Sequence, residues 1–96
     1  MKIEPIENGG ETVGYIFMCP GCKMHHVVYT KNIRNNPVWE FNGDLEKPTF
    51  YPSILVTWPG TKNICHSFVK EGRIQFLSDC THEFAGKTVE LEEVVD

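Results

Sequence analysis

The feature that most limits how this chain can fold is its set of four cysteines, Cys19, Cys22, Cys65 and Cys80. A chain of 96 residues has room for only a small hydrophobic core, and chains of this size commonly need an additional cross-link. We therefore expect one domain over residues 1–96 that depends on its cysteines for stability.

The N-terminal segment indicates the compartment in which these thiols work. The stretch MKIEPIENGG is polar and offers neither an apolar segment nor a cleavage site of small residues. The sequence also has no run of about 20 apolar residues that would cross a membrane. We expect a cytoplasmic protein, and in the cytoplasm clustered thiols favour metal binding over disulfides.

The charged residues argue against one class of partner. The chain has a net charge of −4, and its nine lysines and arginines are scattered along the sequence. Nucleic-acid-binding surfaces collect basic residues in a patch or stripe that meets the phosphates. We therefore expect no nucleic-acid partner.

The first pair of cysteines has the spacing of a zinc knuckle, Cys19-Pro20-Gly21-Cys22. Two thiolates separated by one tight turn can reach the same tetrahedral ion. The flanking segments, 12–18 and 26–30, are rich in β-branched and aromatic residues. They predict two strands that form a hairpin with both thiols at its tip.

The rest of the chain alternates short strand-like segments with turn signals. Asn42-Gly43 and Glu71-Gly72 are typical of tight turns, and Asn42-Gly43 suits a turn with positive φ at both residues. One helical turn is predicted at 81–87. The pattern predicts an all-β (β-rich) fold, a small antiparallel sheet domain with a zinc-knuckle hairpin. Its further strands are expected at 38–41, 53–58, 63–69, 73–79 and 88–91.

A hairpin that turns at Glu71-Gly72 places the second cysteine pair on one face. In this register Lys70 lies opposite Arg73, and side chains alternate between faces along each strand. Cys65 and Cys80 then fall on the same side of the sheet. With the knuckle they predict a structural zinc site of four thiolates: Cys19, Cys22, Cys65 and Cys80.

Several alternatives to this ligand set remain open. His26 or His82 would each replace one cysteine, because both lie near the cysteines in sequence. Cys65 and Cys80 would otherwise be small buried hydrophobic residues, as free cysteines often are. A disulfide is disfavoured because nothing indicates export.

The same register places His66 and Asp79 together on the opposite face, as diagonal neighbours. A carboxylate in this position orients a histidine and stabilises its charged form. Ser53 opens the preceding strand, and consecutive strands usually lie side by side. Ser53, His66 and Asp79 are therefore a candidate Ser/His/Asp catalytic set. Two other hydroxyl residues are weaker nucleophile candidates: Thr49 lies near Ser53, and Ser67 is predicted to face the metal.

The same three residues also have an interpretation without catalysis. In that interpretation Ser53 begins a strand, His66 is a hydrogen-bonded sheet residue and Asp79 caps the next turn. A bulge in the hairpin would shift the faces and separate the pair. A catalytic zinc held by three histidines is a further alternative, but it leaves the CPGC knuckle unexplained; its ligands would be His26, His66 and His82.

A series of ordered motifs over residues 15–91 resembles a known family. The motifs are CPGC, W-x-F-N-G-D, K-P-T-F-x-P-S-I-L-V, C-H-S-F-V-x-x-G-R-I-Q-F-L-S-D-C-T-H and A-G-K-T-V-E-L. They resemble small zinc-binding domains of phages and prophages that have no assigned function and sometimes carry an ammonia monooxygenase label. Relatives of that family lie beside bacterial ubiquitin-like conjugation genes and look like peptidases that process or remove the ubiquitin-like protein.

The resemblance implies hydrolysis at a peptide or ester carbonyl, with the family's motif residues falling on Ser53, His66, Asp79 and the four cysteines. It implies a protein or peptide substrate, for which a ubiquitin-like conjugate is one candidate, and the bacterial host cytoplasm as the location of a phage-encoded member. The competing function is a non-catalytic, zinc-ribbon-like module that binds a protein through exposed aromatic side chains.

Overall fold

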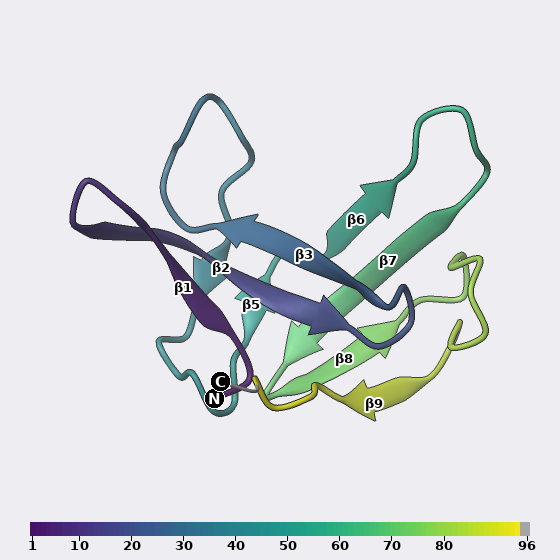
Figure 1. Ribbon diagram of the computed structural model, residues 1–96. Helices are drawn as coiled ribbons and strands as arrows, with labels where there is room; N and C mark the ends of the chain where they lie inside the picture. The colour runs from purple at the N-terminus through teal and green to yellow at the C-terminus, as the bar shows by residue number, and fades with distance from the viewer. Residues whose placement is uncertain (95–96) are drawn as a thin grey trace.

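The chain is built from short antiparallel strands. The computed structural model describes residues 1–94, which contain nine strands and no helix. The strands form three antiparallel sheets with the orders β1-β2-β3, β4-β5 and β6-β7-β8-β9 (Figure 1). The predicted all-β fold is confirmed. The strands are β1 (Glu4–Asn8), β2 (Glu11–Cys19), β3 (Met24–Tyr29), β4 (Glu40–Phe41), β5 (Phe50–Tyr51), β6 (Ile54–Thr57), β7 (Ile64–Lys70), β8 (Arg73–Phe76) and β9 (Thr88–Glu90).

β2 and β3 form the predicted hairpin with the CPGC turn at its tip. Cys19, the last residue of β2, pairs with Met24, the first residue of β3. Lys23 has a φ of 58°, and its N–H donates to the Cys19 carbonyl at 2.8 Å. The closed turn brings Cys22 back over Cys19, whose sulfur accepts the Cys22 N–H at 3.4 Å.

β7 and β8 fold back at Glu71-Gly72 in the predicted register. Lys70 pairs with Arg73 across the turn. Glu71 and Gly72 have φ values of 49° and 81°, the left-handed conformation that a two-residue hairpin turn requires at both positions. The register that sorts side chains between the two faces is therefore the predicted one.

The two faces of the β6–β9 sheet differ in their surroundings. One face packs against Phe17, Cys19 and Val28 of the β1–β3 sheet, and together they form the core. The other face is open to solvent and carries Leu55 and Gln75. The buried face consists of Ile54, Cys65, Ser67, Val69, Ile74 and Phe76.

Two corrections concern the strands. The polar N-terminal segment forms β1, a strand that the sequence pattern did not predict, and Gly9 and Gly10 turn it into β2 with φ values of 61° and 80°. β8 ends at Phe76, so Asp79 does not lie in a strand as predicted. The chain turns there instead, because the N–H of Cys80 donates to the carbonyl of Leu77 at 3.2 Å.

Two further corrections concern turns. Residues 81–87 form turns and bends instead of a helical turn. At Asn42-Gly43 only Gly43 has a positive φ, 84°, because the Asn42 side chain accepts the N–H groups of Asp44 and Thr49 and organises a longer loop. The residues that the structure describes include no helix of the length and apolarity needed to span a membrane.

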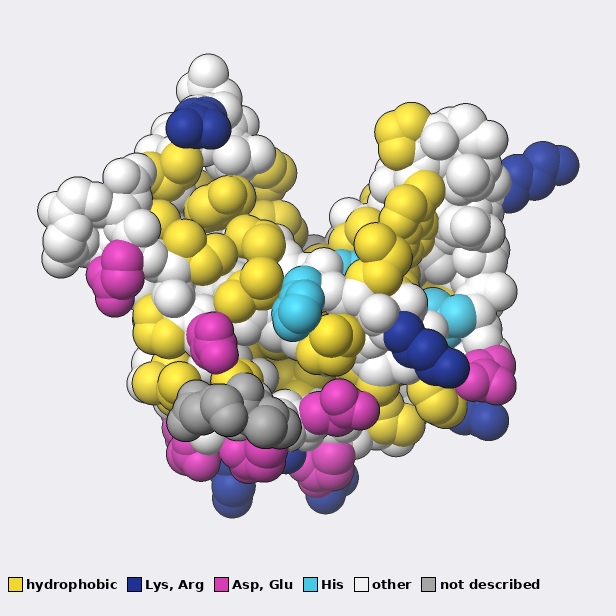
Figure 2. Space-filling model, in the orientation of Figure 1, with side chains coloured by type: hydrophobic (Ala, Val, Ile, Leu, Met, Phe, Trp, Pro, Cys, Tyr) yellow, Lys and Arg dark blue, Asp and Glu magenta, His cyan; other side chains and the backbone are white. Residues whose placement is uncertain are grey.

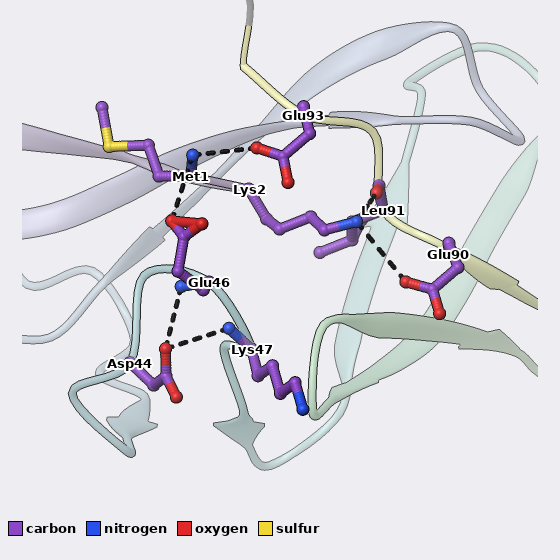
Figure 3. Close-up of polar contacts among 8 residues, drawn as sticks. All are labelled: Met1, Lys2, Asp44, Glu46, Lys47, Glu90, Leu91 and Glu93. Carbon is purple, nitrogen blue, oxygen red and sulfur yellow. Dashed lines mark hydrogen bonds and ion pairs between the residues drawn. The ribbon is translucent and has the colours of Figure 1, made fainter.

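The first residues of the chain lie beside residues 90–93. Lys2 Nζ donates to the Leu91 carbonyl at 2.6 Å and forms an ion pair with Glu90 at 3.4 Å (Figure 3). The terminal amine of Met1 lies within 3.1 Å of Glu46 and 2.9 Å of Glu93, and both pairs are exposed. Surface ion pairs of this kind contribute little individually. The apolar side chain of Leu91, which is 1 % exposed, provides the firmer attachment.

Candidate active site and metal centre

The structure brings Ser53, His66 and Asp79 into one hydrogen-bonded chain. The hydroxyl of Ser53 lies 3.1 Å from Nε2 of His66. On the other side of the ring, Nδ1 of His66 lies 3.1 Å from Oδ2 of Asp79. A carboxylate that accepts from Nδ1 leaves the lone pair of Nε2 directed at the hydroxyl, which is the arrangement that a general base requires.

Sheet pairing brings the first two of these residues together. His66 pairs with Leu55 on the neighbouring strand β6. Ser53 lies two residues before Leu55, so its side chain is on the same open face as His66. The contact between Ser53 and His66 therefore follows from the register of β6 on β7.

A turn, and not a strand, positions the carboxylate. Beyond the end of β8, the N–H of Leu77 still donates to the carbonyl of His66 at 2.9 Å. The chain then turns at Cys80 and directs Asp79 toward the imidazole. The side chain of Asp79 is 52 % exposed and that of His66 is 25 % exposed, so this face is accessible from solution.

The two weaker nucleophile candidates have other surroundings. The hydroxyl of Thr49 accepts the N–H of Glu71 at 2.8 Å and so stabilises the β7–β8 turn. Ser67 is fully buried on the core face. Of the three hydroxyl residues, only Ser53 contacts the imidazole of His66.

A second polar cluster lies at the tip of the β2–β3 hairpin. The ligand atoms of Cys19, Cys22, His26 and Cys65 all lie within 4.8 Å of one another. Three of the four predicted metal ligands therefore meet, and His26 joins them as one of the predicted alternates. The cluster has the composition of a site that could hold a metal ion.

The distances fit a tetrahedral ion. Sulfur atoms bound to one zinc ion at about 2.3 Å are separated by roughly 3.8 Å. Sγ of Cys19 lies 3.8 Å from Sγ of Cys65. His26 is 5 % exposed, and its Nε2 is buried without a hydrogen-bond partner, which leaves this nitrogen free to bind a metal.

The thiols also show the electrostatic coupling of a ligand cluster. The Cys65 thiol donates to Cys19, and this contact, together with those from His26 and the Cys22 N–H, lowers the pKa of Cys19 to about 4. Burial raises the pKa of Cys22 to about 11, and donation to Cys19 raises the pKa of Cys65. The Cys19 thiol therefore loses its proton easily, whereas a second thiolate in the cluster needs a nearby cation to compensate its charge.

The fourth predicted ligand, Cys80, belongs to an overlapping group. Its sulfur clusters with Cys65 and His82, and it accepts the N–H of His66 at 3.2 Å. The same kind of N–H···S contact joins Cys22 to Cys19. Cys80 and His26 are therefore both available as the fourth ligand beside the three thiols that meet.

His82 packs on the knuckle itself. Its Nδ1 accepts the N–H of Phe84 at 3.2 Å, so a neutral ring carries its proton on Nε2 and has no free lone pair for a metal. The Nε2 atom of His82 is buried and has no hydrogen-bond partner among the described residues. A Cβ atom on Gly21 would lie 2.4 Å from the ring, so glycine is required for this contact.

The three-histidine zinc site finds no geometric support. His26 and His82 belong to different groups, and His66 belongs to neither of them. His66 is hydrogen-bonded to Ser53 and Asp79 instead.

The two sites share short stretches of chain. Cys65 immediately precedes His66, and Asp79 immediately precedes Cys80. The sulfur of Cys80 also contacts the carbonyl oxygen of His66 at 3.1 Å. The backbone that positions the sulfur cluster is therefore the same backbone that positions the imidazole of His66 and the carboxylate of Asp79.

Comparison with known proteins identifies the family. No curated protein and no solved structure matches the chain. A family model described as "Bacterial ubiquitination-like system serine protease (BubE)" matches residues 4–77. The matched segment contains Ser53 and His66, whereas Asp79 and Cys80 lie beyond it. The chain belongs to the BubE family of serine proteases of bacterial ubiquitination-like systems.

Proposed function

We propose that the protein is a serine hydrolase that cleaves a peptide or ester bond through Ser53, His66 and Asp79. The observation that carries the proposal is the pair of hydrogen bonds on His66, at 3.1 Å to Ser53 and 3.1 Å to Asp79. The name of the family, a serine protease family, supports the same chemistry. In this assignment Ser53 is the nucleophile, His66 the general base and acid, and Asp79 the residue that orients His66.

The reaction follows the acyl-enzyme route. Nε2 of His66 takes the proton of Ser53 as Oγ forms a bond to the substrate carbonyl carbon. The tetrahedral adduct collapses, the bond to the leaving nitrogen or oxygen breaks, and His66 returns the proton to that atom. Water then repeats the sequence on the acyl-enzyme and releases the acid and free Ser53. Asp79 stabilises the imidazolium in both halves.

The metal in this proposal is a structural zinc ion. Cys19, Cys22 and Cys65 hold it, and the fourth ligand is either Cys80 or His26. Four protein ligands leave no open position for a substrate or water, so the ion contributes folding energy and takes no part in the reaction. Metal analysis of Cys80→Ser and His26→Ala separates the two sets, because only loss of a true ligand lowers the zinc content.

The substrate class is a protein or peptide, with a ubiquitin-like conjugate as the first candidate. The family description places its members in bacterial ubiquitination-like systems. In such a system the bond to be cleaved joins the ubiquitin-like protein to a tail, a target or an ester-linked carrier. All of these present the carbonyl carbon that Ser53 requires.

A fluorophosphonate probe tests the proposal. We expect the zinc-loaded protein to gain the mass of one phosphonyl adduct as Ser53 displaces fluoride. Ser53→Ala and His66→Ala should abolish the adduct. Ser78→Ala, which alters an exposed serine outside the site, is the control and should label normally. A folded, zinc-loaded protein that does not label would contradict the proposal and favour the zinc-ribbon-like binding module.

A further inference from the structure

The catalytic set crosses the sheet in one direction and ends at a free edge. Asp79 follows β8, His66 lies on β7, and Ser53 directly precedes β6. β6 is the outermost strand of its sheet and pairs with β7 alone (Figure 1). The side of Ser53 that faces away from His66 is therefore the open edge of β6.

The hydrogen bonds of β7 show which groups of β6 are free. The N–H and C=O of His66 bond to Cys80 Sγ and to the Leu77 N–H, on the side away from β6. Ile64 likewise bonds to Thr81. Residues of β7 that point away from β6 make non-hydrogen-bonded pairs with it.

The non-hydrogen-bonded pairs between β6 and β7 are Leu55 with His66 and Thr57 with Ile64. The N–H and C=O groups of Leu55 and Thr57 must therefore point outward, away from β7. Among residues 1–94 no other backbone group bonds to them. They form a short ladder of free donors and acceptors, which is the feature that recruits an additional strand.

Trp39 marks the end of this ladder beside the nucleophile. The carbonyl of Ser53 also points outward, by the same alternation, and it accepts the indole N–H of Trp39 at 3.2 Å. This bond occupies the carbonyl of Ser53 and leaves the outward groups of Leu55 as the first free ones next to Ser53. A strand bound to β6 thus finds a free donor and a free acceptor at Leu55, whereas at Ser53 the carbonyl is already occupied and cannot pair with the segment that reacts.

The edge also has room and an apolar contact. Figure 2 shows a hollow between the part of the molecule that contains β1–β3 and the β6–β7 hairpin, with hydrophobic side chains on both flanks. The side chain of Leu55 is 58 % exposed and lies on the face of His66. A residue paired with Leu55 would place its side chain on that same face.

We propose that the free edge of β6 binds the acyl part of the substrate as an antiparallel strand. The occupant is an extended peptide segment with an apolar residue opposite Leu55. This inference rests on the proposed function and adds to it the conformation and the recognition element of the substrate.

The register follows from the position of the nucleophile. The substrate residue that supplies the attacked carbonyl lies opposite Ser53. In an antiparallel pair the residue opposite Leu55 is then the third on the acyl side, counting the attacked residue as the first. It exchanges both hydrogen bonds with Leu55, whereas the N–H of the second residue points away from β6.

Two consequences distinguish this mode from binding to a folded surface. The substrate must present at least three residues of unstructured chain before the cleaved bond, because a folded segment has no free main-chain groups to pair. Recognition must also depend on alternate backbone N–H groups along the segment, and most strongly on that of the third residue.

The test uses a peptide diphenyl phosphonate that labels serine nucleophiles by losing phenol. The probe is acetyl-Ala-Ala-Leu-Ala followed by the alanine phosphonate, with leucine in the third position. Labelling of the zinc-loaded full chain is followed by intact mass. N-methylation of the leucine should lower the labelling rate by about tenfold or more, and N-methylation of the second residue by less than about twofold.

Variants of Leu55 test the same main-chain pairing between Leu55 and the third residue of the probe. Leu55→Pro removes the outward N–H without removing a bond to β7, and Leu55→Ala removes only the side chain. We expect Leu55→Pro to label with the peptide phosphonate about tenfold more slowly than Leu55→Ala. The fluorophosphonate rate of each variant is measured as well, and the peptide-phosphonate rate is divided by it to correct for any change in the reactivity of Ser53; thermal unfolding should show that both variants remain folded.

The outcomes separate the two proposals. Equal rates for the two N-methylated probes, or for the two Leu55 variants, would overturn strand pairing while fluorophosphonate labelling of Ser53 still supports the hydrolase. A faster reaction with leucine in the second position than in the third would overturn the register. Failure of both phosphonates to label a folded protein would overturn the hydrolase and this inference together.

Discussion

The two faces of the β6–β9 sheet carry different chemistry on adjacent residues. The buried face holds Cys65 among apolar side chains, and the open face holds His66 next to it. The buried side is nearly closed to solvent, with Cys65 only 1 % exposed. On the open side the Asp79 carboxylate is half exposed. One strand thus supports a closed ligand cluster and an accessible polar set at the same time, because successive side chains point in opposite directions.

This difference between the faces predicts that stability and reactivity can be changed separately by substitution. Changes on the buried face should act on folding, and changes on the open face should act on reactivity while leaving the fold intact. Four experiments test this division, and they are ordered by the largest effect that each is expected to give.

The largest effect is expected for Cys19→Ser on the buried side. In so small a domain the energy of metal binding is largely folding energy, so we expect loss of bound metal and of the cooperative thermal transition. Metal content by mass spectrometry and unfolding by circular dichroism measure both. Ser78→Ala serves as the control. A Cys19→Ser protein with full metal content and an unchanged transition would show that this thiol is not a ligand.

Asp79→Asn should have the largest effect among changes on the open face. An amide cannot stabilise the imidazolium, and it favours the wrong tautomer of His66, so fluorophosphonate labelling should slow by on the order of 10²-fold or more. Because Asp79 is 52 % exposed, the free energy of unfolding should change by less than about 0.5 kcal/mol. Labelling at the original rate would remove Asp79 from the catalytic set.

Neighbouring residues on β8 provide the most direct comparison of the two faces. Ile74 is fully buried, and Ile74→Ala should cost about 2–5 kcal/mol because it leaves a cavity in the core. Gln75→Ala, one residue along on the open face, should cost less than about 0.5 kcal/mol. Urea unfolding measures both values. Similar costs at the two positions would mean that the faces do not differ as described.

Among the changes that should lower stability, the smallest effect is expected for Gly21→Ala at the knuckle. The new Cβ would lie 2.4 Å from the His82 ring, and relief of that overlap should cost about 1–3 kcal/mol. The matched control is the same change in a His82→Ala background, where the ring is absent and the cost should fall below about 0.5 kcal/mol. An equal cost in both backgrounds would locate the strain in the turn instead of in the contact with His82.

Much of this arrangement was predictable from local sequence signals. The CPGC turn and Glu71-Gly72 each define a hairpin by turn chemistry, and the second hairpin fixes the register in which His66 lies opposite Leu77, two residues before Asp79. Alternation along β7 then separates Cys65 from His66. These features depend on residues close in sequence, where pattern rules work best.

The features that were missed depend on tertiary contacts. β1 pairs with β2 although its outer residues are polar, and the only local signal was Gly9-Gly10 before an apolar strand. His26 was predicted only as an alternate ligand, because its approach to Cys65 results from the packing of two sheets, which spacing along the chain does not reveal. Asp79 reaches His66 from a turn, whereas strand periodicity placed it in β8.

The sequence positions of the sulfur cluster have a consequence for the order of events during synthesis. Its parts come from residues near 20, at 65 and near 80, so the nascent polypeptide can present the knuckle to a metal long before the remaining ligands emerge from the ribosome. Ser53 and His66 are likewise made before Asp79. The Ser53–His66–Asp79 chain cannot be completed until residue 79 has been translated, and a fragment that stops before that residue would contain Cys19, Cys22, His26 and Cys65 but neither Asp79 nor Cys80.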